Sequence, residues 1–360
     1  MRRAPGNDIL KVLCYVAAVL LLAALIAPWL YNGGKALFEV AGTKVAPVVT
    51  KRTLSPLTAL ADACGRSNFP RFFNRSVMIS AVVLFFPLMK WLKVGAGPVR
   101  YRDTPWSFRL PDSAIATHEG QPLRRNPLGW LQMLVGFILA AGGLSALAYW
   151  LVQAGAFVMV NQTVSTKGAA NIFPVQPLHF WKFVPQALFS SLLVAVLEES
   201  VFRGALLGIF LRALRPWAAI VGLSLLFAFV HFLDPKTLGA VPDPESSKAG
   251  LWLLGKILAQ YADPLPLLSS FGTLFGLGGV VAYARWRTAS LWLPIGLHAG
   301  WVCGIFMFKE LTQVVPGLGG LSPFVIGSTL REGLAPLGVV LLTGVVVHFL
   351  TRGDAERTPA

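Results

Sequence analysis

The sequence predicts an all-α, polytopic transmembrane helical bundle of about eight spans. Hydrophobic residues make up 55% of the 360 residues and charged residues only 13%, whereas soluble domains contain roughly 25% charged residues. The apolar residues also form long runs, and a helix needs about 20 of them to cross a bilayer. This composition excludes a soluble two-domain enzyme, a disordered chain and a disulfide scaffold.

Eight apolar runs give the expected spans. The first follows a basic start and is longer than the core of a signal peptide, so we expect an uncleaved span. The third exceeds 30 residues and must either tilt strongly or extend outside the bilayer. In chain order, the expected spans are residues 9–31, 77–91, 128–160, 183–211, 217–233, 265–284, 291–308 and 334–350.

The connections differ in charge and polarity. Residues 32–75 form a long basic loop whose partly apolar middle suits interfacial helices. Residues 161–176 form a polar loop, residues 234–248 a mildly acidic one, and residues 251–261 a short amphipathic piece. No internal repeat stands out, which counts against an inverted-repeat transporter.

The formal net charge of +15 has two interpretations, nucleic-acid binding and membrane orientation. The basic residues lie in short clusters between apolar runs, as charges that orient helices and contact anionic headgroups do. With both termini cytoplasmic, most basic loops fall inside and the acidic 234–248 loop outside. We therefore expect a multi-pass membrane protein with membrane lipids and no nucleic acid as partners. The absence of organelle signals and the compact size indicate a prokaryotic plasma membrane. The arginines of the inside loops are Arg100, Arg102, Arg124, Arg125, Arg212, Arg215, Arg285 and Arg287.

Two adjacent carboxylates stand inside the fourth span. A charge at mid-membrane costs roughly 2.5 kcal/mol or more, so Glu198 and Glu199 are candidate functional residues. Arg203 follows Glu199 by one helical turn, which predicts an ion pair. Glu198 then remains available as a proton acceptor. The alternative interpretation is a solvated cluster at the membrane edge.

Two histidines also lie within apolar spans. His231 closes the motif Phe227-x-x-x-His231, and His298 lies between Gly296 and Gly300. A single membrane histidine is more often a hydrogen-bonded packing residue than a catalyst. Two glutamates and two histidines on three spans, however, form a set able to activate water, through general-base action or through a metal.

The ordered motifs resemble those of the CAAX protease and bacteriocin-processing (CPBP, or Abi) family of intramembrane endopeptidases. The motifs are Glu198-Glu199-x-x-x-Arg203, Phe227-x-x-x-His231 and His298, and the resemblance covers roughly residues 180–305. Accordingly, we expect an N-terminal membrane region over residues 1–175, a catalytic core over 176–310, and a last span with a cytoplasmic tail over 311–360.

The resemblance implies peptide-bond hydrolysis in a water-filled cavity of a helical bundle. Glu198, helped by His231, would activate water, and His298 would stabilise the oxyanion. Glu199 and Arg203 would hold the site in its geometry. The implied substrate is a membrane-associated peptide or a lipidated protein, including prenylated CaaX ends.

One position departs from the family pattern. The family usually has Asn or Asp four residues after the third-motif histidine, and Val302 at that position cannot donate a hydrogen bond. Losing one oxyanion donor costs roughly 100-fold or more in rate. Three alternatives follow: the activity is weak, another donor such as Asn171 or Ser224 substitutes, or the protein is a non-proteolytic relative.

A metal is the remaining open question. Glu198, His231 and His298 would supply the three ligands of a catalytic zinc, but the sequence identifies no second carboxylate to orient either histidine. The sequence therefore favours a glutamate mechanism without metal. Two further functions stay open: a non-catalytic scaffold or immunity factor of the same fold, and a proton-coupled transporter.

Overall fold

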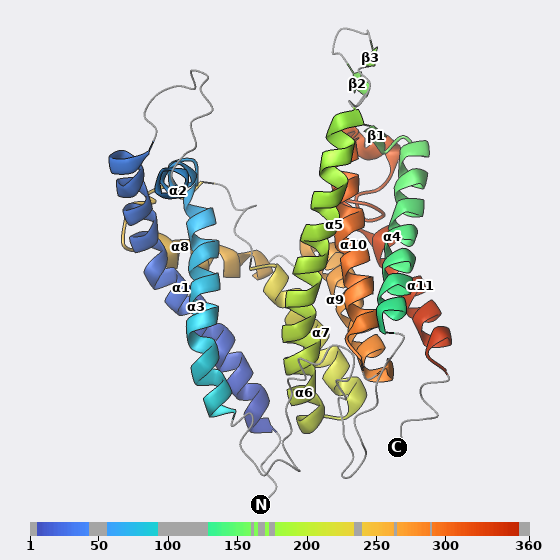
Figure 1. Cartoon of the computed structure of the whole chain (residues 1–360), viewed down its shortest axis with the longest axis horizontal. Coiled ribbons are helices and arrows are strands. Elements are labelled where there is room, and N and C mark those ends of the chain that lie inside the picture. The colour runs from blue at the N-terminus through green and yellow to red at the C-terminus, as the bar shows by residue number, and fades with distance from the viewer. Residues whose placement is uncertain are drawn as a thin grey trace, which may run out of the picture. The chain divides into compact units, whose positions relative to one another are not determined.

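The computed structural model describes residues 6–42, 56–92, 129–159, 162–164, 170–172, 177–233, 240–262, 265–288 and 290–352 (Figure 1). The chain divides into two compact units. The first unit comprises Met1–Ala96 and His231–Pro264, and the second comprises Gly97–Val230 and Leu265–Ala360.

The first unit is built on two long antiparallel helices. Tyr15 Oη donates to the carbonyl of Ala81 at 2.8 Å, and Lys11 Nζ donates to the carbonyl of Trp91 at 3.4 Å. The start of one helix thus lies beside the end of the other. The elements are α1 (Gly6–Ala41), α2 (Pro56–Gly65), α3 (Phe69–Trp91), α8 (Ala249–Ala259) and the 3₁₀ helix η4 (Gln260–Ala262).

The second unit is a bundle of helices that carries the sequence motifs. Its helices are α4 (Gly129–Gln153), α5 (Pro177–Glu199), the π-helix η2 (Ser200–Leu206), α6 (Leu207–Ala213), α7 (Pro216–His231, whose last residue falls in the first unit), α9 (Leu265–Thr288), α10 (Trp292–Leu311), the 3₁₀ helix η5 (Pro316–Gly320) and α11 (Leu334–Leu350). Figure 1 shows α10 running between α4 and α5.

Glycines bring α10 and α4 into backbone contact. A Cβ on Gly296 would overlap the carbonyl oxygen of Met133, and one on Gly300 would lie 2.5 Å from that of Phe137. His298 projects from the opposite side of α10, because two helical residues are about 200° apart. The glycine ridge therefore fixes α10 against α4 and turns His298 toward α5 and η2.

Four short strands form two antiparallel pairs in the second unit. Strand β1 (Phe157–Met159), which follows α4, pairs antiparallel with β4 (Thr312–Val314), which follows α10. Strands β2 (Gln162–Val164) and β3 (Ala170–Ile172) pair with each other within the expected polar loop. The β1–β4 pair thus joins the last turns of α4 and α10.

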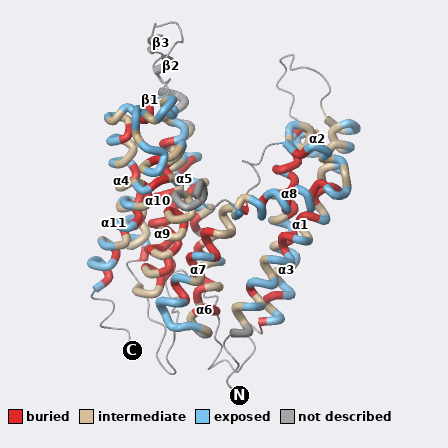
Figure 2. The backbone as a smooth tube through the Cα atoms, turned by 180° about the vertical axis from the view of Figure 1, so that it is seen from behind, coloured by how far each residue is buried: buried red, intermediate tan, exposed pale blue. Residues whose placement is uncertain are grey.

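The described residues have the surface of a membrane protein. Buried residues follow the inner faces of the helices in each unit, and the outward faces are exposed (Figure 2). Those exposed faces carry large apolar side chains, among them Trp29, Phe86, Ile138 and Phe189. In water such faces would be unfavourable, whereas in a bilayer they contact lipid.

The predicted all-α helical bundle is confirmed, although eight spans are not. Among the described residues, three helices are long and apolar enough to cross a membrane: Asp8–Ala41, Phe69–Trp91 and Gly129–Gln153. Two shorter apolar helices are Pro216–His231 and Leu334–Leu350.

Two expected boundaries were wrong. Of the residues expected as a loop over 32–75, those up to Ala41 belong to α1, those of Pro56–Gly65 form α2, and those from Phe69 onward belong to α3. Asn68 caps α3 early, its side chain accepting from the backbone N–H of Arg71. The span expected over residues 128–160 ends at Gln153, since Gly155 takes a φ of 73° and the chain enters β1.

Candidate active site

The first motif lies where the helix changes its winding. The helix that begins as α5 continues through the π-helix η2 into α6, and the N–H of Leu207 bonds to the carbonyl of Phe202, five residues back. Such π segments are rare and frequently lie at functional sites. Glu198 and Glu199 end the α-helical part, and Arg203 lies within the π segment.

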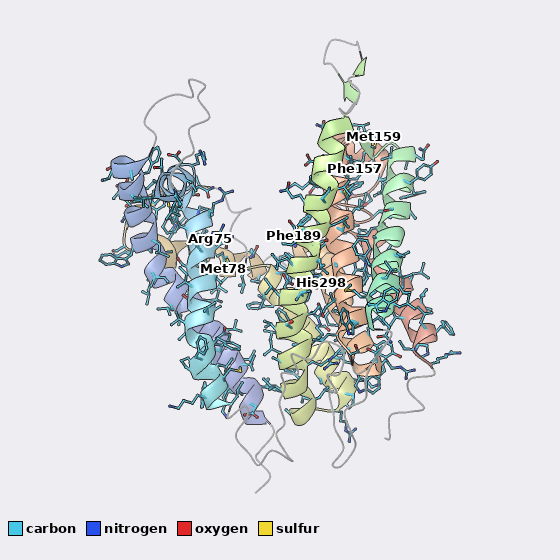
Figure 3. The ribbon with its side chains drawn as sticks, in the orientation of Figure 1. Arg75, Met78, Phe157, Met159, Phe189 and His298 are labelled. Carbon is cyan, nitrogen blue, oxygen red and sulfur yellow. The ribbon has the colours of Figure 1, made fainter. Side chains whose placement is uncertain are left out.

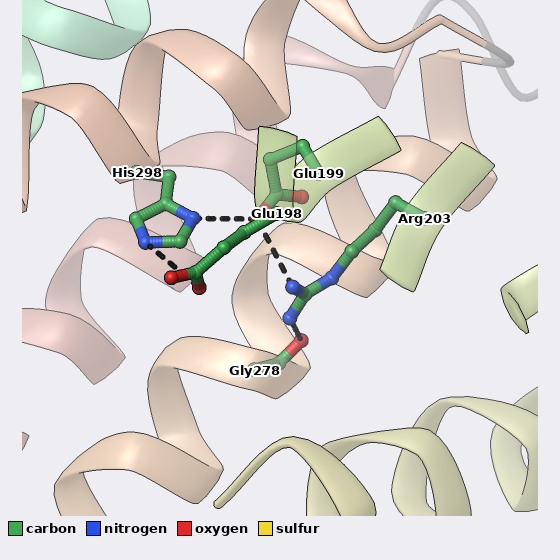
Figure 4. Close-up of polar contacts among 5 residues, drawn as sticks. All are labelled: Glu198, Glu199, Arg203, Gly278 and His298. Atoms are coloured by element: carbon green, nitrogen blue, oxygen red, sulfur yellow. Dashed lines mark hydrogen bonds and ion pairs between the residues drawn. The ribbon is translucent and has the colours of Figure 1, made fainter. Parts of the chain in front are cut away.

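The ion pair expected within the motif is present and fully buried. Arg203 Nη1 donates to Glu199 Oε1 at 3.0 Å, and both side chains are 0% exposed. Arg203 Nη2 donates to the carbonyl oxygen of Gly278 on α9 at 3.0 Å (Figure 4). The guanidinium therefore links η2 to α9.

Glu199 has a second partner that the sequence did not indicate. His298 Nδ1 lies 2.7 Å from Glu199 Oε1, and His298 Nε2 lies 3.8 Å from Glu198 Oε2 (Figure 4). The imidazole thus stands between the two adjacent carboxylates. Glu199 is the orienting carboxylate that the sequence could not identify, since 99 residues separate it from His298 and no local spacing reports that contact.

The two glutamates differ in accessibility. The side chain of Glu199 is 0% exposed, whereas that of Glu198 is 31% exposed. Consecutive helical residues are about 100° apart, so one carboxylate faces the packed interior and the other an open side. Glu199 is therefore enclosed by protein, whereas Glu198 is partly exposed, with its Oε2 buried toward His298.

Aromatic rings enclose the buried pair. The guanidinium carbon of Arg203 lies 4.4 Å from the ring centre of Phe227 on α7, and the Phe202 ring contacts Phe227 edge-on at 5.0 Å. Phe227 also meets the ring of His298 at 6.1 Å. The phenylalanine of the second motif therefore covers the pair and strengthens it by a cation–π contact.

A glycine allows α9 to approach this group. A Cβ on Gly278 would lie 3.2 Å from the Cα of Ser224 and 3.3 Å from the Phe227 ring. Without that side chain, the carbonyl of Gly278 reaches Arg203. Figure 3 places His298 about midway along the second unit, well away from Phe157 and Met159 at its end.

The structure describes the side chain of only one of the two residues considered as substitute oxyanion donors, Asn171 and Ser224. Ser224 Oγ donates to the carbonyl of Ile220 at 2.6 Å, so its proton is already used within α7. The side chain of Asn171 lies outside the described part of the chain. Val302 is half-buried on α10, one turn after His298.

His231 is the last residue of α7 and falls in the first unit. The structure therefore brings Glu198, Glu199, Arg203 and His298 together and does not place His231 relative to them. Helix α7 does bring Phe227, one turn before His231, into the site.

The zinc alternative names Glu198, His231 and His298 as ligands, and the structure does not place His231 relative to the other two. Among the described residues, no group of three His, Cys, Asp or Glu side chains lies close enough to hold a metal ion. Within the second unit, Nδ1 of His298 is engaged by Glu199, which in turn holds Arg203.

Comparison with known families agrees with this motif assignment. Residues 180–304 match the family model described as Type II CAAX prenyl endopeptidase Rce1-like, which confirms the resemblance to the CPBP family. This family supports an intramembrane endopeptidase activity in general, with a membrane-associated peptide or prenylated protein as its substrate. No curated protein and no solved structure matches the chain.

Proposed function

We propose that this protein hydrolyses a peptide bond of a membrane-associated substrate with a water molecule that Glu198 activates. The observation that carries the proposal is the arrangement of one accessible carboxylate, Glu198, beside an imidazole fixed by a buried ion pair. A protein that only needed a packed helix crossing would not require four polar groups there, since their burial is costly.

The proposed reaction uses protein groups alone. Glu198 takes a proton from water as the water oxygen attacks the scissile carbonyl carbon, and the carbonyl oxygen becomes an oxyanion. The carbon–nitrogen bond then breaks, and the proton held by Glu198 passes to the departing amine. The products are a carboxylic acid and an amine, so one water molecule is consumed in each turnover.

His298 is proposed to stabilise the oxyanion from a fixed orientation. A carboxylate paired with Arg203 only accepts hydrogen bonds, so Nδ1 of His298 carries a proton toward Glu199. Nε2 then faces Glu198, and it donates to an oxyanion once the ring is protonated.

His231 is proposed to assist Glu198, as the family resemblance implies. It is supported by its place one helical turn after Phe227, whose ring contacts both Arg203 and His298. A prenylated CaaX end is one proposed substrate, and an unmodified membrane peptide is the other.

A comparison of protein termini tests the proposal for any substrate that the host membrane contains. The host's membrane proteome is compared between cells with the wild-type chain and cells with Glu198→Gln. Glu310→Gln serves as the matched control, since Glu310 is exposed at the far end of α10. We expect termini that vanish with Glu198→Gln and persist with Glu310→Gln. Identical termini in all three would indicate a non-catalytic scaffold.

A further inference from the structure

Aromatic and basic side chains from three helices meet at one end of the second unit. This aromatic–basic cluster comprises Trp217 on α7; Tyr283, Trp286 and Arg287 on α9; and His348 and Arg352 at the end of α11. None of these residues belongs to the candidate active site, and none carries a motif of the family resemblance.

The rings form a continuous stack across the helices. Trp217 lies parallel to Tyr283, with centres 5.7 Å apart and an angle of 14°, and it meets Trp286 at 5.9 Å. The Tyr283 hydroxyl and Nδ1 of His348 are hydrogen-bonded at 2.6 Å. The start of α7 is thereby joined to the ends of α9 and α11.

Two arginines cover the end of this stack. Arg287 Nη2 donates to the carbonyl of Thr351 at 2.8 Å, and its guanidinium carbon lies 5.9 Å from the Tyr283 ring centre. The guanidinium of Arg352 lies 4.2 Å from the ring centre of Phe349. Both cations offset the negative end of the α11 dipole, which would otherwise repel an anion.

Within the three helix segments that meet here, the charged residues have a single sign, although Arg285 is buried. The segments 212–222, 280–292 and 340–352 contain five arginines and no aspartate or glutamate: Arg212, Arg215, Arg285, Arg287 and Arg352. Acidic residues follow only with Asp354 and Glu356. A ligand that complements this surface is therefore an anion.

The apolar side chains beside the cluster indicate where that anion lies. Along α7, exposed Trp217 is followed by exposed Val221 and Leu225. Along α11, which runs the other way, exposed Leu342 and Val345 precede the cluster. From the middle of the bundle toward this end, both helices present lipid-facing aliphatic residues first, then aromatic rings, then arginine. The same order is found at a membrane–water interface.

We propose that the aromatic–basic cluster binds the headgroup of an anionic phospholipid. The arginines contact the phosphate, the tryptophan and tyrosine rings lie at the headgroup level, and the acyl chains run along the exposed aliphatic residues of α7 and α11. The site is independent of the proposed peptidase activity, because it uses no residue of that site.

The test measures lipid binding to the purified full chain. Native mass spectrometry in detergent compares the binding of phosphatidylglycerol and phosphatidylcholine to the wild type and to the double variant Arg215→Gln/Arg352→Gln. Arg215 is exposed two residues before Trp217, and Arg352 is exposed at the end of α11, so the variant removes charge beside the stack and is expected to fold. We expect wild-type preference for phosphatidylglycerol, and about a fivefold loss of its affinity per arginine removed, or about 25-fold in all.

The matched control removes two positive charges from the opposite end of the unit. Lys309 and Arg331 are exposed near the end of α10 and just before α11, and Lys309→Gln/Arg331→Gln should retain wild-type affinity. Equal losses in both double variants, equal binding of the two lipids, or displacement of the lipid by millimolar inorganic phosphate would each overturn the proposal.

Discussion

Glu198 and Glu199 are adjacent in the chain, but they lie in different surroundings. Glu199 is fully buried between Arg203 and His298, whereas Glu198 is partly exposed. In the proposed mechanism Glu199 therefore holds the local structure together, and Glu198 activates water. This division predicts that substitutions at the two positions differ in their effect on stability.

Arg203→Leu should destabilise the protein and abolish activity together. The change leaves the Glu199 carboxylate buried without its cation, and such a loss costs about 3–5 kcal/mol. Thermal unfolding of the purified protein in detergent measures the stability, and peptide cleavage measures the activity. Normal stability with altered kinetics alone would instead make Arg203 a substrate-binding residue.

The double variant Glu199→Gln/Arg203→Leu is the control for that experiment. It removes both charges, so most of the lost stability should return. Activity should stay low, because His298 has lost the carboxylate that orients it. Recovery of both properties would show that Glu199 does not position the imidazole.

Val302→Asn tests the departure from the family pattern. If catalysis uses two oxyanion donors, an amide one turn after His298 should raise turnover by up to about 2–4 kcal/mol of transition-state stabilisation. If position 302 is shielded from water, the same amide would lack a hydrogen-bond partner and would lower the stability by about 1–3 kcal/mol. Melting temperature and cleavage rate of one purified variant separate these outcomes; unchanged activity with lowered stability means that Val302 does not face the site.

The sequence predicted the Glu199–Arg203 pair because both partners lie one turn apart on one helix. It did not predict that Glu199 also holds His298 or that Gly278 accepts from Arg203. Both contacts join different helices, and their geometry depends on packing, which a local spacing does not encode. The π-helical winding at Arg203 likewise has no signal in the motif.

At the scale of elements, the glycine ridge of α10 positions His298. Gly300→Ala should cost about 1–3 kcal/mol and reduce cleavage, because the new Cβ would overlap the Phe137 carbonyl and force α10 away from α4. Gly142→Ala on α4 is the matched control, since no atom lies within 4 Å of its added Cβ. Equal stability of the two variants would contradict this role of the ridge.

Apolar run length predicted most helix positions in the second unit. The last expected span coincides with α11, at Leu334–Leu350, and the expected 291–308 span lies largely within α10. The expected boundaries were wrong where an apolar run continues beyond the end of a helix, or where a helix begins within a polar stretch. Gly155 ends a helix inside an apolar run, and α3 begins within a stretch rich in arginine. Hydropathy indicates which residues suit the bilayer core, whereas helix caps and glycines with positive φ determine where each helix begins and ends.

At the scale of the whole molecule, the proposed mechanism predicts a peptidase that needs no metal. Dialysis of the purified protein against a chelator should leave its cleavage rate within about twofold of the untreated value, since Glu198 itself takes the proton from water. Elemental analysis of the active protein checks the same point. A loss of activity restored by added zinc would contradict the glutamate mechanism.

The most direct test of the central claim is cleavage by purified protein reconstituted in lipid. Wild type, Glu198→Gln and Glu310→Gln are compared on a farnesylated CaaX peptide and on its unmodified counterpart, and melting temperatures are measured alongside. The proposed mechanism predicts cleavage of at least one peptide by the wild type and by Glu310→Gln, and a loss of about 100-fold or more in Glu198→Gln at unchanged stability. Wild-type rates in Glu198→Gln would contradict the claim that Glu198 activates the attacking water.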